Sequence, residues 1–445
     1  MHQINIGMIG GGTVGSGVFH HLQNNGALME SRLGLKLSLP KIAVKSLDKS
    51  RAYNIPKSLM TTDWASVVND PNIHLIIELV GGTTLAKTMV VSALKLGKPV
   101  ITANKALISA HGEELFALAQ RYGTNLYYEA SVAGGIPIIK VLREGFAGNR
   151  ITHMYGIVNG TCNYILTRMK HEGSDFQPTL QDAQKLGYAE ADPTLDVDGF
   201  DAAHKIGILA SLAHGFWVKP GQIHVEGIRP VTKTDIEFAN KLGYTIKLLG
   251  IVKLIEGATS ARKSKSVNRK SIQVSVCPTL VPNTHVLASV NQVFNAVFVR
   301  GDAVGDTLFY GRGAGKDATA SAVLSDVADA ALDLKYGLKQ RVAPFVAFEK
   351  NGVVLPVDEM VSRYYLRLSV MDRPGTLAKV SAILAASKIG ISSVIQPEGH
   401  EGDTVPLILM MHTAPYAAMK KALVKISKLP VVKTAPVMFR VENFE

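Results

Sequence analysis

The sequence predicts an α/β protein that begins with a doubly wound parallel sheet, continues as an α+β segment and ends in a βαββαβ unit. Three observations predict this order. Short apolar runs alternate with helical patterns over residues 4–128, and a glycine-rich turn joins the first run to the first helical pattern. Residues 361–445 then show strand, helix, strand, strand, helix and strand patterns, in that order.

The first turn has the spacing Gly10-x-Gly12-x-x-Gly15, directly after the apolar run Ile4–Ile9 and before a helical pattern. Gly10 permits a tight turn, Gly12 lets a pyrophosphate approach the backbone, and Gly15 lets the helix pack closely on the strand. A glycine turn without a ligand is the alternative, and the strand and helix around the motif disfavour it. The helix N-terminus supplies N–H groups to phosphates. The predicted dinucleotide contacts in this turn are Gly10, Gly12, Thr13, Val14 and Gly15.

The predicted second strand, Lys41–Val44, is followed by Lys45. Sites specific for NAD usually place an acidic residue here to bind the ribose 2′-hydroxyl, whereas a basic residue suits the 2′-phosphate of NADP. We therefore expect NADP to be favoured, while Asp48 nearby keeps NAD open. Later apolar runs end in further candidate cofactor contacts, because ligands gather at the C-terminal ends of parallel strands. These candidates are Gly81, Thr102 and Lys105.

The composition is that of a globular protein, with 47% hydrophobic and 19% charged residues and a formal net charge of +12. Only two cysteines are present, Cys162 and Cys277, which predicts neither a disulfide framework nor a zinc site. The chain starts without a signal-peptide pattern and has no apolar run of about 18 residues, so we expect a cytoplasmic protein without a membrane span. The densest basic run, Arg262–Lys265, has no interleaved aromatic residues, so a solvated loop is expected there rather than a nucleic-acid site.

Five segments closely resemble homoserine dehydrogenases and occur in the same order within residues 5–330. They are Val100–Leu107, Glu129–Pro137, Gly156–Ile165, Gly187–Lys205 and Gly311–Ala322. The resemblance implies NAD(P)-dependent interconversion of L-homoserine and L-aspartate 4-semialdehyde, within the synthesis of threonine, isoleucine and methionine. It also makes Gly315 a cofactor contact.

Reduction of an aldehyde requires a hydride on carbon and a proton on oxygen. The cofactor brings the hydride, so the protein must supply the proton and stabilise the developing alkoxide. A lysine whose pKa is lowered by burial or by a neighbouring cation can do both. The resemblance implies that Lys205 is the proton donor and that Lys105 positions substrate and cofactor. The residues alone leave the division of proton transfer between the two lysines open.

The substrate implied by this resemblance carries an ammonium group, which needs an acidic partner. The resemblance implies that Glu190 binds homoserine, and Asp196 is a second candidate. Asp201 precedes Lys205 by four residues, so in a helix the two side chains would share a face and could form a pair that holds the lysine in place. An ordinary surface salt bridge has the same spacing and is the alternative.

The resemblance also implies a sodium ion, held largely by backbone oxygens in the loop that contains Glu129, Val132, Gly134 and Ile136. Backbone carbonyls suit a hard monovalent cation, and a tight glycine turn without an ion is the alternative. The acidic run Asp192–Asp201 lacks the spacing of an EF-hand loop, so we expect no catalytic divalent ion.

The C-terminal unit resembles an ACT domain, a module that often binds free amino acids. The resemblance implies feedback inhibition by threonine, and a purely structural dimerisation module is the alternative. We expect a homodimer or homotetramer. The predicted divisions are an NAD(P)-binding domain at 1–148 completed by about 310–335, a catalytic and dimerisation domain at 149–309, a linker at 336–360 and the ACT domain at 361–445.

Two other functions are weaker interpretations of the same sequence. A dehydrogenase that acts on aspartate semialdehyde needs a nucleophilic cysteine, and Cys162 would have to serve within Asn-Gly-Thr-Cys-Asn. A sensor of nucleotides and amino acids, built on the same folds, would have no use for both Lys105 and Lys205.

Overall fold

The structure is a computed structural model that describes residues 3–255, 270–397 and 403–444. The chain forms two compact units, and each is assembled from three separate stretches of sequence. The first unit contains Met1–Met154, His204–Pro220 and Asn295–Gly352; the second contains Tyr155–Ala203, Gly221–Phe294 and Val353–Glu445. The basic run 262–265 lies outside the described residues.

The first unit is built on a six-stranded sheet with the order β3-β2-β1-β4-β5-β6, and every neighbouring pair is parallel. The predicted parallel sheet is therefore confirmed. The strand order reverses between β1 and β4, and ligands bind parallel sheets at such a switch point. The strands are β1 (Gln3–Ile9), β2 (Lys36–Ala43), β3 (Met60–Thr61), β4 (Leu75–Glu78), β5 (Val100–Thr102) and β6 (Leu126–Tyr127).

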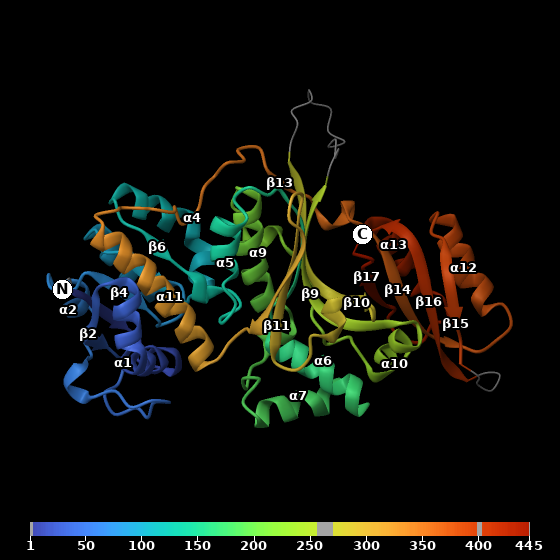
Figure 1. Ribbon diagram of the computed structural model, residues 1–445. Helices are drawn as coiled ribbons and strands as arrows, with labels where there is room; N and C mark the ends of the chain where they lie inside the picture. Colours follow the sequence, from blue (N-terminus) through green and yellow to red (C-terminus); the bar gives the residue numbers. More distant parts are fainter. Residues whose placement is uncertain (1–2, 256–269, 398–402, 445) are drawn as a thin grey trace. The chain divides into compact units, whose positions relative to one another are not determined.

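Two long helices of the first unit pack against each other, α1 and α11 (Figure 1). Val18 of α1 and Val323 of α11 belong to one buried cluster, which also contains sheet residues such as Ile77. A Cβ atom at Gly17 would lie 2.6 Å from the carbonyl oxygen of Lys316, so glycine allows this close approach. The helices of this unit include α1 (Thr13–Leu33), α2 (Ala65–Val68), α3 (Thr84–Lys95), α4 (Lys105–Arg121), α5 (Ile138–Lys140) and α11 (Lys316–Lys335), with the π-helical turn η3 (Val141–Gly145).

The second unit contains a mixed sheet in which the strand order includes β9-β10-β17-β14-β16-β15. The two longest neighbours, β9 and β10, pair antiparallel along their full lengths, from Tyr244 with Pro282 to Ile255 with Ser271. β17 joins β10 in parallel, and β14 pairs antiparallel with both β17 and β16. The strands are β9 (Tyr244–Ile255), β10 (Ser271–Pro282), β14 (Val361–Met371), β15 (Ile391–Ile395), β16 (Thr404–Pro415) and β17 (Val437–Val441).

The C-terminal part of this unit follows the order β14, α12, β15, β16, α13, β17 along the chain (Figure 1). Its helices are α12 (Thr376–Ala386) and α13 (Tyr416–Ile426). Val380 and Leu384 of α12 and Met419 of α13 are fully buried in one apolar cluster with Leu366 and Leu368 of β14. The alternation of inward residues along β14 produces the apolar face on which both helices pack.

The remaining elements are further strands, helices and short turns of the two units. Asp201 and Lys205, whose spacing suits a helix, both lie on α9. None of the helices in the described part of the chain combines the length and the apolar character needed to span a bilayer. These elements are β7 (Ile151–Ile157), α6 (Gly160–Glu172), α7 (Phe176–Lys185), α8 (Thr194–Val197), α9 (Phe200–His214), β8 (His224–Val225), α10 (Lys233–Lys241), β11 (Phe294–Gly301), β12 (Gly305–Arg312) and β13 (Val353–Val354), with the 3-10 turns η1 (Lys57–Leu59), η2 (Glu129–Ser131), η4 (Pro220–Gln222), η5 (Val286–Ser289) and η6 (Val357–Glu359).

Candidate active site

The glycine turn lies between β1 and α1, in the context that the sequence predicts. Gly10 has a φ of 110°, a conformation open to glycine, and its N–H donates to the carbonyl of Ala43 at the end of β2 (2.8 Å). A Cβ atom at Gly15 would overlap the carbonyl oxygen of Gly10, whereas one at Gly12 would meet nothing within 4 Å. Gly12 is the N-cap of α1, and no side chain within the described residues caps the helix. The first-turn N–H groups, including those of Thr13 and Val14, therefore suit an anionic group.

The loop after β2 is organised by Arg51. Its Nε donates to the carbonyl of Gly11 in the glycine turn (3.1 Å), and its terminal nitrogens donate to the carbonyls of Ser46 and Lys49 (both 2.7 Å). Lys45 is exposed at the start of this loop. The sequence places Arg51 near Lys45 but does not predict this role, because Arg51 binds backbone atoms that only the fold brings within reach.

Asp48 is the acidic residue that left NAD as the alternative cofactor. It forms an exposed ion pair with Lys57, with 2.7 Å between Oδ1 and Nζ. The hydrogen bond and the charge of Lys57 lower the pKa of Asp48 below its usual value. Its carboxylate is therefore engaged by a cation of the same loop.

A buried carboxylate, Glu78, shapes the turn after β4. Its Oε1 accepts from the backbone N–H groups of Val80 (2.7 Å) and Gly81 (3.2 Å), and its Oε2 accepts from the hydroxyl of Thr102 at the end of β5 (2.7 Å). Glu78 is fully buried. Two predicted cofactor contacts, Gly81 and Thr102, are thus held by one carboxylate that the sequence did not assign to the site.

Asn104 fixes the neighbouring turn, where β5 leads into α4. Its Nδ2 donates to the carbonyl of Gly82 (2.7 Å), its N–H donates to the Thr102 hydroxyl (3.0 Å), and its Oδ1 caps α4 by accepting from the N–H of Leu107 (3.1 Å). Lys105 is consequently the first residue of α4, directly at the C-terminal end of a parallel strand. This is the edge at which such sheets bind ligands.

Replacing Glu78 by glutamine is expected to weaken dinucleotide binding about tenfold, the effect of roughly 1.4 kcal/mol. Glutamine has an oxygen at only one of the two positions that the carboxylate oxygens occupy. Its NH2 group must therefore face either the N–H groups of Val80 and Gly81 or the Thr102 hydroxyl. Calorimetric titration with the cofactor measures the change. Glu114→Gln, which alters an exposed ion pair with Lys87, is the matched control, and equal affinities in both variants would contradict this role.

The loop predicted to bind sodium begins at Glu129. The carboxylate of Glu129 is buried and accepts from the backbone N–H groups of Ile139 (2.9 Å) and Lys140 (2.7 Å). Burial raises the pKa of Glu129 to about 7, although these two hydrogen bonds oppose the shift. No group of three or more His, Cys, Asp or Glu side chains suited to a metal occurs among the residues that the structure describes. Val132, Gly134 and Ile136 have no side-chain oxygen, so they can contribute only backbone oxygens to a cation here.

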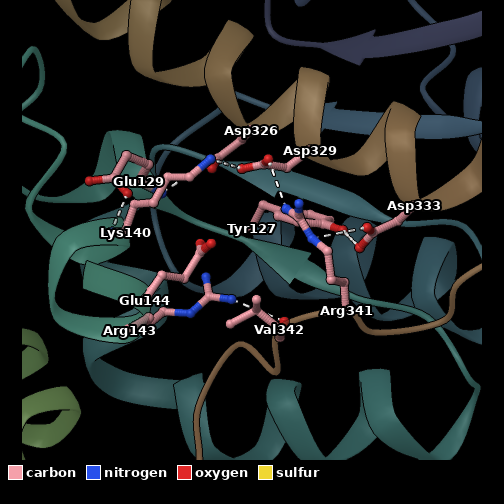
Figure 2. Close-up of a pocket in the computed structure, with 10 residues that line it drawn as sticks. All are labelled: Tyr127, Glu129, Lys140, Arg143, Glu144, Asp326, Asp329, Asp333, Arg341 and Val342. Carbon is pink, nitrogen blue, oxygen red and sulfur yellow. Dashed lines mark hydrogen bonds and ion pairs between the residues drawn. The ribbon is translucent and has the colours of Figure 1, made fainter. Parts of the chain in front are cut away.

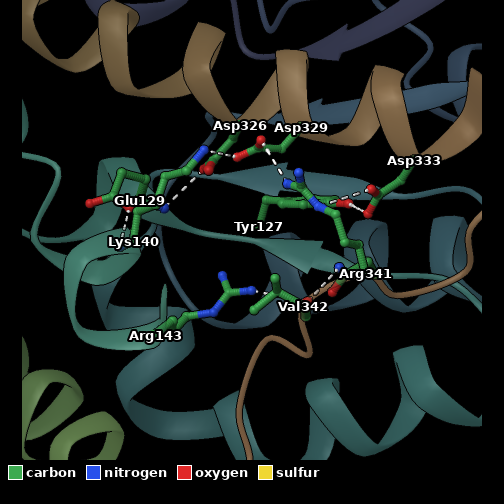
Figure 3. A network of polar contacts seen from close by, with 10 residues as sticks. Tyr127, Glu129, Lys140, Arg143, Asp326, Asp329, Asp333, Arg341 and Val342 are labelled. Carbon is green, nitrogen blue, oxygen red and sulfur yellow. Dashed lines mark hydrogen bonds and ion pairs between the residues drawn. The ribbon is translucent and has the colours of Figure 1, made fainter. Parts of the chain in front are cut away.

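Next to this loop, acidic residues of α11 hold the surrounding segments together (Figures 2 and 3). Asp326 is buried and its Oδ2 accepts from the N–H of Glu129 (2.9 Å). Burial, followed by the nearby Glu129 carboxyl, raises the pKa of Asp326 well above its usual value. One turn further, Asp329 pairs with Lys140 (2.7 Å) and Arg341 (3.0 Å).

The last acidic residue of this network is Asp333, whose Oδ2 accepts from the hydroxyl of Tyr127 at 2.7 Å (Figure 3). The network surrounds a cavity of about 10 Å³, which is the room needed by one water molecule (Figure 2). Such a cavity is too small for an amino acid or a nucleotide. The network therefore serves to fasten α11 to β6 and the loop after it.

In the second unit, the predicted acidic residues lie on and before α8 and at the start of α9. Asp196 belongs to α8, Asp201 is buried in the first turn of α9, and Glu190 is exposed in the preceding turn. The structure brings Asp196 and Asp201 to one side chain, because the Nδ2 of Asn159 donates to both carboxylates, at 2.7 Å and 2.9 Å respectively. Lys205 follows one turn after Asp201 on α9 and is also buried.

The start of α6 adds further contacts to this cluster. The Oδ1 of Asn159 caps α6 by accepting from the N–H of Cys162 (2.8 Å), and the Cys162 thiol donates to the backbone carbonyl of Asp196 (3.1 Å). Cys162 is fully buried. A buried thiol that donates to a backbone carbonyl does not fit the nucleophile required by an aspartate semialdehyde dehydrogenase.

A buried lysine on β9, which sequence reasoning missed, stabilises the other side of α6. The Nζ of Lys247 donates to the Oδ1 of Asn163 (3.1 Å), the carbonyl of Val290 (2.5 Å) and the Oδ1 of Asn291 (3.1 Å). Burial, with a smaller contribution from the charge of Lys170, lowers the pKa of Lys247 to about 7. Because its three described acceptors are neutral, this lysine has a structural role in joining α6 to the segment after η5.

Two family models match the chain: the NAD-binding domain of homoserine dehydrogenase over residues 10–129, and homoserine dehydrogenase over residues 137–328. Homoserine dehydrogenase from Pseudomonas aeruginosa is 41% identical over 448 residues, which cover 100% of both chains. The crystal structure of a homoserine dehydrogenase from Thiobacillus denitrificans matches with a TM-score of 0.90 and 41% identity, over 100% of this chain and 99% of that chain. A hyperthermophilic archaeal homoserine dehydrogenase in complex with NADPH matches with a TM-score of 0.60 and 25% identity, over 74% of this chain and 98% of that chain. The full-length similarity, together with the glycine turn and the clustered carboxylates, shows that the chain belongs to the homoserine dehydrogenase family of oxidoreductases.

Proposed function

We propose that the protein interconverts L-homoserine and L-aspartate 4-semialdehyde with a nicotinamide dinucleotide, in the synthesis of threonine, isoleucine and methionine. The observation that carries the proposal is the full-length similarity to homoserine dehydrogenases, in a chain that has a phosphate-binding turn at Gly10–Gly15. The open space at Gly12 and the uncapped start of α1 fit the pyrophosphate of such a cofactor. When bound, the cofactor accepts or returns the hydride.

The residues of this chain then handle the proton and the charges. In homoserine oxidation, Lys205 takes the hydroxyl proton as a general base, and in reduction its ammonium returns that proton to the developing alkoxide. Lys105, at the C-terminal end of β5, positions substrate and cofactor. Glu190, Asp196 and Asp201 bind the substrate ammonium, and Asp201 in addition orients Lys205 from one turn away on α9.

NADP is the proposed preferred cofactor. Lys45 is exposed directly after β2, where the 2′-phosphate of NADP is bound in proteins of this architecture, and Asp48 is already paired with Lys57. The archaeal homoserine dehydrogenase named above was solved with NADPH. Both observations support a cofactor that carries the additional phosphate.

A sodium ion is proposed at the loop of Glu129, Val132, Gly134 and Ile136. Both carboxylate oxygens of Glu129 accept backbone N–H groups, so a cation there would be held by backbone oxygens. Among the described residues, the structure gives the carbonyls of Ile136 and Glu129 amide donors, whereas it gives none to those of Val132 and Gly134. These two carbonyls fit the cation, which would keep the loop in its turn.

The C-terminal part, residues 361–445, is proposed to be an ACT domain that binds threonine and lowers activity. The strand order β17-β14-β16-β15 with α12 and α13 supports this assignment, since it is the ferredoxin-like arrangement. The same proposal divides the chain into a cofactor domain at 1–148 with 310–335, a catalytic and dimerisation domain at 149–309 and a linker at 336–360. A homodimer or homotetramer is the proposed assembly.

The test of the proposed activity is homoserine oxidation, followed by the absorbance of the reduced cofactor with NADP and NAD in parallel. We expect turnover that depends on homoserine. No turnover with either cofactor, in protein that unfolds cooperatively, would overturn the proposal. Addition of threonine to the same assay tests the regulatory part, which fails if neither activity nor thermal stability changes.

Replacing Lys45 by alanine is expected to raise the KM for NADP about tenfold and to leave the KM for NAD unchanged, because a charge-assisted contact with the 2′-phosphate contributes roughly 1.5 kcal/mol. Steady-state kinetics with both cofactors measure the two values. Lys36→Ala, an exposed lysine at the opposite end of β2, is the matched control. Equal increases for both cofactors would contradict recognition of the phosphate.

A further inference from the structure

The amide side chain of Asn159 lies at the junction between the end of β7 and the start of α6. Its single nitrogen donates to Asp196 Oδ1 (2.7 Å) and to Asp201 Oδ2 (2.9 Å). A primary amide has two hydrogens on that nitrogen, so each carboxylate receives one of them. The fixed angle between the two hydrogens sets the accepting oxygens roughly 5 Å apart.

The other end of the amide is engaged as well. Its Oδ1 accepts from the N–H of Cys162 and thereby caps α6. With both hydrogens and the oxygen used, the amide cannot rotate without breaking three hydrogen bonds. The distance and direction between Asp196 and Asp201 therefore depend on where α6 begins.

The start of α6 is itself held firmly. A Cβ atom at Gly160 would lie 2.9 Å from the carbonyl oxygen of Val293, so the helix start is packed directly against that backbone. One turn later, the Nδ2 of Asn163 donates to the carbonyls of Val290 and Gln292 at 3.1 Å and 2.9 Å. The segment 290–293 thus fixes the start of α6, and with it the N-cap residue Asn159 that bonds the two carboxylates.

The chemistry of the amide suits this task. A lysine or arginine at position 159 would also attract both carboxylates, but it would neutralise part of their charge. The amide contributes no net charge, so it orders Asp196 and Asp201 without neutralising either carboxylate. Both carboxylates therefore keep the negative charge that attracts the ammonium of the substrate.

We propose that Asn159 is a positioning residue for the amino-acid substrate, which sets the spacing of Asp196 and Asp201 so that both act on the substrate ammonium. This inference rests on the proposed function, because it assumes that these two carboxylates serve homoserine. It assigns to one neutral side chain a role in substrate binding that is separate from capping α6.

Two variants separate positioning from capping. Asn159→Ser retains an oxygen that can cap α6 but cannot reach both carboxylates with a donor. We expect the KM for homoserine to rise at least tenfold, with the KM for the cofactor within twofold of wild type. Thr232→Ala, which removes the side-chain cap of α10 in the same unit, is the matched control and should lower stability without changing the KM for homoserine.

Asn159→Asp supplies a pH readout. It retains the capping oxygen but places a third carboxylate between Asp196 and Asp201, and only its protonated form can donate a hydrogen bond. Relative to Asn159→Ser, its kcat/KM for homoserine should therefore improve as the pH falls from 8 to 6. A side chain with a capping role only would give parallel pH profiles for the two variants.

The outcomes distinguish this inference from the proposed function. If the wild-type protein oxidises homoserine and Asn159→Ser has the wild-type KM, the positioning role is wrong and the proposed function stands. If Thr232→Ala raised the KM for homoserine as much as Asn159→Ser does, at an equal loss of thermal stability, the positioning role would likewise be wrong. Absence of homoserine turnover in the wild-type protein would overturn the proposed function, and with it this inference.

Discussion

Replacing Lys205 by alanine is expected to lower kcat for homoserine oxidation about 10³-fold, within the range that general acid–base catalysis contributes. Lys205 is buried on α9, one turn after Asp201, and no other lysine occurs on that helix. Alanine has no group that can accept the hydroxyl proton. The predicted cofactor contacts lie after β1, β2 and β4, at the end of β5, at the starts of α1 and α4 and directly before α11. Because none of them lies on α9, the Kd for NADPH should stay within about twofold.

Stopped-flow measurement of the hydride-transfer step, together with a fluorescence titration of NADPH, separates these two quantities. Lys205→Arg keeps a positive charge, but its guanidinium does not lose its proton near neutral pH. This variant should therefore be as inactive as the alanine variant if proton transfer is the role of Lys205. Lys170→Ala, which removes a half-buried lysine bonded to Thr245, is the matched control. If Lys205→Arg kept substantial activity, a group other than Lys205 would transfer the proton. Lys105→Ala would then test whether that group is Lys105.

The fold of this protein is largely predictable because its apolar pattern agrees with its secondary structure. The strand, helix, strand, strand, helix and strand order expected over residues 361–445 is the order β14, α12, β15, β16, α13 and β17 of the structure. The glycine spacing also placed the turn between β1 and α1 correctly. In each case a local pattern, with period 2 or 3.6, is sufficient to identify the element.

Other elements could not be predicted from local patterns. β16 extends over Thr404–Pro415, well beyond its apolar centre Leu407–Met411, because pairing with β14 continues into the flanking residues. β12 has exposed or half-exposed residues throughout and so carries no apolar alternation. α6 begins at Gly160, a residue with poor helix propensity, and the Asn159 cap compensates for it.

The candidate site was predicted in part, and the missing members share one property. Glu78, Asn159 and Lys247 act on groups that are distant in sequence, such as the Thr102 hydroxyl, the Asp196 carboxylate and the Val290 carbonyl. The residues next to them in the sequence do not indicate these partners. A buried polar residue is recognised only once the fold shows what it bonds, because burial itself demands those bonds.

Asp235 shows the same principle in the energetics of folding, and its replacement by alanine is expected to destabilise the protein by about 3–5 kcal/mol. The side chain is fully buried at the start of α10, where its Oδ1 accepts from Arg367 Nε (2.7 Å) and from the Tyr365 hydroxyl (3.0 Å) on β14. Its Oδ2 accepts from the N–H (2.9 Å) and the hydroxyl (2.7 Å) of Thr232, which completes a capping box. Alanine leaves a largely buried guanidinium and a buried hydroxyl without this acceptor.

Denaturant unfolding and thermal unfolding measure the loss, which corresponds to a fall in Tm of about 10 °C for a unit of this size. Glu237→Ala is the matched control, since Glu237 lies on the same helix in an exposed ion pair with Lys233 and should change stability by about 0.5 kcal/mol or less. A second control combines Asp235→Ala with Arg367→Met. The double variant should be more stable than the sum of the two single losses predicts, by about 1 kcal/mol or more, because the unpaired guanidinium is gone.

The size of this effect follows from burial rather than from the number of contacts. The Lys57–Asp48 pair has the same 2.7 Å separation as the Arg367–Asp235 pair, yet its two side chains are 73% and 83% exposed, and water replaces whichever partner is removed. Asp235 is fully buried, so the loss includes the desolvation of every group that the carboxylate bonds. If Asp235→Ala and Glu237→Ala were equally stable, the link between α10 and β14 would contribute nothing, and the C-terminal strands would depend on their apolar packing alone.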